Sequence, residues 1–153
     1  MTATNHALTG AIIGLSLSNP YLAIVLAFVS HFALDALPHF DFAAGRNSDE
    51  HLRTKAFKIY LILNFISCVL LVIFLIIFNS INWLLPSTCA FVAASPDLFS
   101  INHYLSVIKG RKWKPNRFMK LSGAIQWFQR PIGAFVEIAW SISAIVILHF
   151  LIT

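Results

Sequence analysis

Long apolar runs separated by short polar stretches dominate the pattern of this chain. Such runs are typical of helices that sit in lipid, where every backbone polar group must be paired within its own segment. The first run would be only about 21 Å long as a helix, so it is expected either to tilt or to be re-entrant and shielded by protein. The pattern predicts about five helical segments: Asn5–Ser18, Tyr21 to the His31–Asp41 stretch, Ala56–Phe78, Trp83–Ile108 and Pro131–Ile152.

Composition agrees with this pattern and narrows the class of protein. The 153 residues are 58% hydrophobic and only 11% charged, whereas a soluble domain is nearer half apolar and a quarter charged. Cys68 and Cys89 lie inside apolar runs, so we interpret them as small buried hydrophobes rather than as a disulfide. The sequence therefore predicts an all-α, polytopic membrane helical bundle that forms one membrane-embedded domain over residues 1–153.

The basic residues are concentrated in one stretch. Seven of the eleven Lys and Arg residues lie in residues 109–130, a basic linker. Within it Phe118, Leu121, Ile125 and Phe128 recur at helical spacing, which favours an amphipathic helix on the membrane surface. The expected partners are membrane lipids with anionic headgroups rather than nucleic acid. An ordinary basic loop is the alternative.

Charge also predicts the orientation. Residues 43–55 and 109–130 hold ten of the eleven Lys and Arg residues, so both loops should be cytoplasmic. Five segments joined by short outer turns then place the N-terminus in the cytoplasm and the C-terminus outside, in an inner (plasma) membrane. The sequence names no oligomeric state, and a homo-oligomer is compatible with it.

Candidate chemistry begins at the end of the second segment. His31 and Asp35 are four residues apart, which puts both on one helix face. Pro38 cannot continue the helix, so the chain should bend or end there and turn His39 and Asp41 back toward the first pair. Imidazole and carboxylate groups are ligands for divalent metals, and ionisable groups at bilayer depth are costly.

Two further polar groups fall at a similar depth. His6 begins a row of small residues, Gly10, Gly14 and Ser18, whose four-residue spacing permits close helix packing. His6 should then lie at a helix interface, although a position at the water interface is an equal alternative. Asp97 follows Pro96 within the fourth segment. With a rise of about 1.5 Å per residue, these groups and Glu137 gather in the cytoplasmic half, which predicts one shared cavity.

These tracts carry a resemblance. Thr4-x-His6, Ser30-His31-x-x-x-Asp35-x-x-Pro38 and Pro96-Asp97 resemble the membrane-bound metal-dependent hydrolases, described as LexA-binding and associated with the bacterial inner membrane. The resemblance implies a divalent metal ion (Zn, Mn or Fe) and hydrolysis at the membrane.

The first functional hypothesis is therefore a metal-dependent hydrolase at the cytoplasmic face, acting on a lipid-linked phosphoester. In it His6, His31 and Asp97 bind the metal, with His39 as a fourth ligand. Asp35 ligates the metal or orients His31, and Asp35 or Asp41 accepts a proton from water.

Two other hypotheses remain open. His31 and Asp35 can form a structural hydrogen-bonded pair in a membrane protein without enzymatic activity. Intramembrane His and Asp can also relay ions or protons, but the polar groups of this chain cluster in one half of the membrane.

Overall fold

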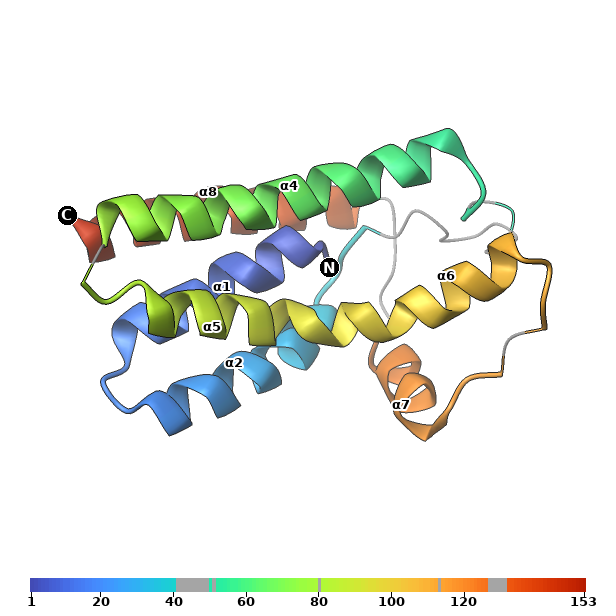
Figure 1. Ribbon diagram of the computed structural model, residues 1–153, viewed down its shortest axis with the longest axis horizontal. Coiled ribbons are helices and arrows are strands. Elements are labelled where there is room, and N and C mark those ends of the chain that lie inside the picture. Colours follow the sequence, from blue (N-terminus) through green and yellow to red (C-terminus); the bar gives the residue numbers. More distant parts are fainter. Residues whose placement is uncertain (41–49, 51, 80, 113, 127–131) are drawn as a thin grey trace.

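The structure, a computed structural model, describes the chain except residues 41–49, 51, 80, 113 and 127–131. The described residues form helices and no β-strand (Figure 1). The predicted all-α helical bundle is thus confirmed. In chain order the helices are α1 (Ala3–Ser16), α2 (Pro20–Asp35), α4 (Lys55–Phe78), α5 (Leu84–Ala94), the 3-10 helix η1 (Ser95–Ser100), α6 (Ile101–Ile108), α7 (Arg117–Ile125) and α8 (Gly133–Ile152).

Local sequence explains where the helices begin and end. Thr2 and Thr54 cap α1 and α4, because each hydroxyl accepts a hydrogen bond from a backbone N–H of the first turn. Asn19 caps α2, and Pro20 follows it at a position where the missing N–H costs nothing. The helix ends at Asp35, three residues before Pro38, as the sequence predicts.

Three helices are long and apolar enough to cross a membrane: α4, the continuous rod Leu84–Ile108 made of α5, η1 and α6, and α8. Their outward faces expose large aliphatic and aromatic side chains, which suits lipid rather than water. The expected count of about five spans is not confirmed, because α1 and α2 have only 14 and 16 residues.

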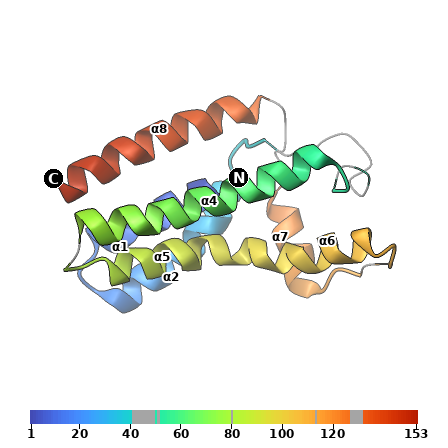
Figure 2. The same ribbon diagram turned by 45° about the horizontal axis from the view of Figure 1, so that its top comes forward.

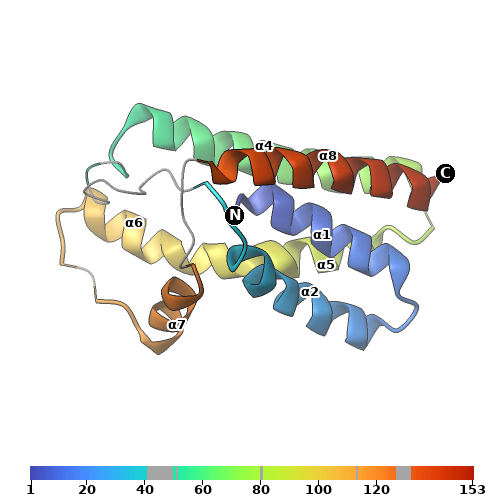
Figure 3. The same cartoon turned by 180° about the vertical axis from the view of Figure 1, so that it is seen from behind.

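Helix α1 lies at the centre of the bundle. It packs against α2, α4, α5 and α8, and Ala7, Leu8 and Ala11 are buried there. Figure 2 shows α4 in front of α1, and Figure 3 shows α1 between α8 and α5. A short helix can be accommodated in this position because the surrounding helices bury its residues between Asn5 and Gly14 that face them.

The small residues of α1 permit this packing. A Cβ added at Gly10 would overlap the backbone carbonyl of Cys89, and one at Gly14 would overlap the backbone of Pro86. The two backbones of α1 and α5 therefore touch along the predicted row of small residues. His6, in the same row, is fully buried, so its predicted place at a helix interface is confirmed.

The predicted amphipathic helix in 109–130 is shorter than that stretch. Among the described residues of that stretch it forms over α7, where Phe118 contacts the rings of Phe32 on α2 and Phe99 on η1, at centroid distances of 6.0 and 4.9 Å. Helix α7 thus packs on the protein through Phe118 and exposes Leu121. Phe128 lies outside the described residues.

Both long rods extend past the N-terminus at one end of the molecule. Figures 1 and 3 show the start of α4, the whole of α6 and the loop that leads to α7 at this end. The C-terminus and the turns that follow α1 and α4 lie at the opposite end.

Candidate metal centre

Asp35, the last residue of α2, is the centre of a buried polar cluster. Its Oδ1 lies 2.6 Å from the amino group of Met1 and 3.1 Å from Nε2 of His6. Its Oδ2 accepts a hydrogen bond of 2.7 Å from Nε2 of Gln126 and lies 3.3 Å from Nε2 of His31. Groups from α1, α2 and the end of α7 therefore meet on one carboxylate.

The hydrogen bond made by Nδ1 of His31 determines whether Nε2 of the same ring carries a proton or a lone pair. Nδ1 lies 2.8 Å from the backbone oxygen of Ala93 on α5. A carbonyl oxygen only accepts, so this nitrogen must carry a proton. In the neutral ring Nε2 then presents a lone pair, and it faces Oδ2 of Asp35 at 3.3 Å and Oδ1 of Asp97 at 3.9 Å. Acceptors that face one another in a buried site need a cation between them, either a proton on the ring or a metal ion.

His6 lies directly against His31. The two imidazole rings stack with centroids 3.9 Å apart and an interplanar angle of 27°. The Nδ1 atom of His6 is buried and has no hydrogen-bond partner among the residues that the structure describes. Because two positively charged rings in this arrangement would repel each other, the geometry favours at least one neutral ring with a lone pair to offer.

The donor atoms fit a divalent metal ion. One atom each from His6, His31 and Asp35 lie within 4.8 Å of one another, so the three residues could hold an ion. Neighbouring ligands around a tetrahedral Zn²⁺ are about 3.3 Å apart, as metal–ligand distances of about 2.0–2.1 Å require. The separations of 3.1 Å from Nε2 of His6 to Oδ1 of Asp35 and of 3.3 Å from Nε2 of His31 to Oδ2 are close to that spacing, and each histidine faces a different oxygen of the carboxylate.

The other predicted site residues lie around this group. Asp97, on η1, lies beside His31 with 35% of its side chain exposed. His39 is buried, donates from Nδ1 to the backbone oxygen of Leu37 at 2.8 Å, and is not one of the three grouped ligands. Asp41 lies outside the described residues.

A cavity of about 240 Å³ adjoins the centre. Asp97 and His39 both line it, so the structure brings these two predicted residues to one space next to the three grouped ligands. Polar groups from η1 and three other segments complete the wall: Met1, Tyr60, Asn64, Ser100 and Gln126. Of the titratable groups expected to share one cavity, Asp97 and His39 line this one, whereas His6, His31 and Asp35 are grouped next to it and are not part of its lining.

Sequence reasoning missed several groups that support the centre. Gln126 approaches Asp35 from 91 positions along the chain, and no local pattern marks such a contact. Asn5 donates from Nδ2 to the backbone oxygen of Glu137 at 3.2 Å and accepts at 2.6 Å from Ser141, which ties α1 to α8 beside His6. The one available signal was the polarity of Asn5 and Glu137 within apolar segments.

Helix α8 also holds the backbone that follows α2 in place. Glu137 accepts a hydrogen bond of 3.2 Å from the N–H of Phe40, and Gly133 lies so close to His39 that a Cβ there would overlap its backbone. The turn at Pro38 therefore docks on the start of α8.

Comparisons of this chain with protein-family models, with curated proteins and with solved structures find no match.

Proposed function

We propose that this chain is a membrane-embedded metal-dependent hydrolase that acts at the cytoplasmic face on a lipid-linked phosphoester. One observation carries the proposal. His31 is oriented by Ala93 so that its Nε2 lone pair faces the carboxylates of Asp35 and Asp97 in a buried site, which is the arrangement that a bound cation would satisfy. The resemblance to membrane-bound metal-dependent hydrolases of the bacterial inner membrane supports the same class.

His6, His31 and Asp35 would hold the ion, and their two nitrogens and one oxygen suit Zn, Mn or Fe. A divalent metal bound there would supply Lewis acidity, which polarises a phosphoryl oxygen and makes water a better nucleophile at neutral pH. Ala93 and Gln126 would fix the orientation of His31 and Asp35, as groups behind metal ligands do.

Proton transfer falls to Asp97 in this proposal. Both oxygens of Asp35 already face two nitrogen atoms each, so that carboxylate has little remaining capacity to take a proton from water. Asp97 lines the cavity and is partly exposed, so it can meet a water molecule there. Asp41, the other sequence candidate for this role, lies outside the described residues.

The cavity suits the head of a substrate rather than its chains. About 240 Å³ is enough for a phosphate with a small group attached, and too little for acyl or prenyl chains. Such chains would lie along the exposed apolar faces of the neighbouring helices. Asn64 and Ser100 would then donate hydrogen bonds to the phosphoester.

Metal analysis tests the proposal. We expect detergent-purified protein to contain close to one equivalent of Zn, Mn or Fe, and His31→Ala to contain less than about a tenth of that. His149→Ala is the matched control, because His149 is an exposed histidine near the end of α8 and should leave the metal content unchanged. Folded wild-type protein that takes up no metal from a supplemented medium would reject the proposal.

A structural role is the second candidate, and a specific observation favours it. Asp35 already has four nitrogen neighbours from this chain, so a protonated His31 would satisfy the cluster without any metal. In that case His31→Gln lowers the unfolding temperature, while wild-type protein shows neither bound metal nor turnover.

A further inference from the structure

A second cavity, of about 590 Å³, lies at the end of α6, apart from the metal centre. Among the residues that the structure describes, its lining includes four cationic side chains and no carboxylate: Arg53, Arg111, Lys112 and Lys114 line it together with His103, Val107 and Gly110. Like charges that share one concave site repel each other and attract an anion. The same stretch of sequence supplies three of the four cations, and Arg53 joins them from the start of α4.

The backbone at this end is built to bring the cations together. Gly110 has a φ of +64° and ends α6, with its N–H bonded to the oxygen of Val107 and the N–H of Arg111 bonded to that of Ser106. This turn fixes the backbone of Arg111 at the end of the helix, directly before Lys112. Arg53 donates from Nη2 to the oxygen of Val107 at 2.7 Å, which uses one of its five N–H donors.

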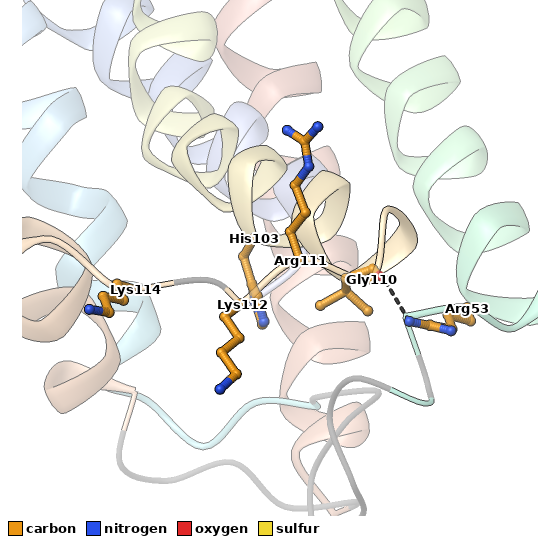
Figure 4. A pocket seen from close by; sticks show the side chains of 7 residues that line it. Arg53, His103, Gly110, Arg111, Lys112 and Lys114 are labelled. Carbon is orange, nitrogen blue, oxygen red and sulfur yellow. Dashed lines mark hydrogen bonds between the residues drawn. The ribbon is translucent and has the colours of Figure 1, made fainter.

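Figure 4 shows how the side chains are placed. Arg53 and Lys112 lie on opposite sides of His103, whereas Arg111 extends away from Lys112. The rings of Phe57 and Tyr104, 5.7 Å apart, join α4 to α6 beneath this arrangement. Packing of α4 against α6 thus brings Arg53, just before α4, and the loop after α6 to one cavity.

The end of α6 lies at the depth expected for lipid phosphates. The rod Leu84–Ile108 is about 40 Å long, because η1 rises about 2.0 Å per residue and the α-helical parts about 1.5 Å. A bilayer with its headgroups is about 40–45 Å thick. The residues that follow Ile108 therefore lie where one layer of headgroups lies. Leu105 and Ile108 are exposed beside the cavity, as contact with acyl chains requires.

We infer that this cavity binds the phosphate headgroup of an anionic phospholipid, and that a phosphomonoester headgroup is preferred. Four cations match the two negative charges of a phosphomonoester better than a zwitterionic headgroup. His103 is six residues beyond Asp97 on the same rod, so the cavity begins about 10–11 Å from Asp97 along the axis. The bound lipid is an anchor rather than the reacting substrate, and the inference does not depend on hydrolysis.

Lipid binding to the full chain tests the inference. Native mass spectrometry of detergent-purified protein would measure binding of dioctanoyl phosphatidic acid, dioctanoyl phosphatidylcholine and inorganic phosphate. We expect phosphatidic acid to bind best, and Arg53→Gln with Lys112→Gln to weaken it by roughly tenfold or more. The matched control is Arg117→Gln with Lys120→Gln, which removes the same charges from exposed positions on α7 outside the cavity and should change binding less than about twofold.

Three results of these binding measurements would overturn the inference or its assignment to a lipid. Equal weakening by the control pair would show nonspecific attraction to the net charge and would overturn the inference. Inorganic phosphate that binds as tightly as phosphatidic acid would overturn the assignment to a lipid. Because Arg53 also contacts Val107, circular dichroism should confirm folding of the double variant. The single variant Lys112→Gln, in an exposed loop, should still weaken binding about fivefold, and no effect there would overturn the inference as well.

Discussion

The imidazole rings of His6 and His31 stack at a centroid distance of 3.9 Å, and the Nε2 atoms of both rings face the carboxylate of Asp35. The two histidines come from different helices and are 25 residues apart, so the stack exists only because α1 packs inside the bundle. The geometry of the candidate metal centre therefore depends on the packing of α1 inside the bundle.

Metal binding should stabilise the protein through this arrangement. A ligand that binds only the folded state adds stability by mass action, about 2.7 kcal/mol at a hundredfold excess over the dissociation constant. We expect added Zn²⁺ or Mn²⁺ to raise the unfolding temperature of wild-type protein and of Asp97→Asn, but not of His31→Ala. A thermal unfolding series in detergent measures this. An equal rise for His31→Ala would place the ion elsewhere.

Substitution of the two carboxylates near His31 should affect different properties: Asp35→Asn the stability of the fold, and Asp97→Asn the activity. Asp35→Asn replaces a buried charge that faces the Met1 amino group and two histidines, so we expect a loss of about 3–5 kcal/mol in the free energy of unfolding. Asp97→Asn changes a partly exposed group and should cost less than about 1 kcal/mol while it abolishes phosphoester hydrolysis. Chemical denaturation and a phosphate-release assay read the two effects. Full activity of Asp97→Asn would remove Asp97 from the proposed mechanism.

Close packing of α1 against α5 gives a test that involves no metal. Gly10→Ala forces a Cβ against the backbone of Cys89, and overpacking of this kind costs about 1–3 kcal/mol. Gly123→Ala on α7 is the control, because no atom lies within 4 Å of the added Cβ and alanine favours a helix by up to about 1 kcal/mol. Thermal unfolding should therefore move in opposite directions for the two variants. A neutral Gly10→Ala would show that α1 and α5 are further apart.

Helix α7 should depend on Phe118 for its place. Removal of that ring in Phe118→Ala breaks the contacts with Phe32 and Phe99, each of which contributes about 0.5–1.5 kcal/mol. Hydrogen exchange over Arg117–Ile125 should accelerate, and metal affinity should fall because Gln126 follows this helix. Leu121→Ala, on the exposed face of α7, is the comparison that should leave exchange unchanged.

Orientation can be measured with single cysteines in a background where Cys68 and Cys89 are replaced by alanine. An impermeant thiol reagent should label Asn82→Cys in intact cells and Lys112→Cys only after lysis, since the basic loops are expected in the cytoplasm. Labelling of Lys112→Cys in intact cells would reverse the proposed orientation and put the metal centre near the outer face.

Much of the fold follows from local features of the sequence. Apolar length marks α4 and α8, Pro38 marks the end of α2, and the spacing of Gly10 and Gly14 marks the buried face of α1. These signals act over one helix turn or one helix length, so a sequence displays them directly. The number of spans was harder to predict, because a short apolar helix can be shielded by neighbours that only the tertiary structure supplies.

The candidate site likewise has some features that the sequence displays and others that only the tertiary structure supplies. His31 and Asp35 share one helix face and are visible as a pair, and the unusual depth of His6 and Asp97 draws attention to them. Neither the contact of Gln126 with Asp35 nor the bond from His31 to Ala93 has any local signature. Both depend on how distant helices pack, as does the cavity that Arg53 completes with the loop after α6.

The four neighbours of Asp35 also set an order of events during synthesis. His6, His31 and Asp35 are made with the first two helices, but Gln126 follows only after α4, the rod Leu84–Ile108 and α7 have been made. Until then Oδ2 of Asp35 lacks the hydrogen bond from Gln126. The complete set of neighbours around this carboxylate can therefore form only when most of the chain has been synthesised.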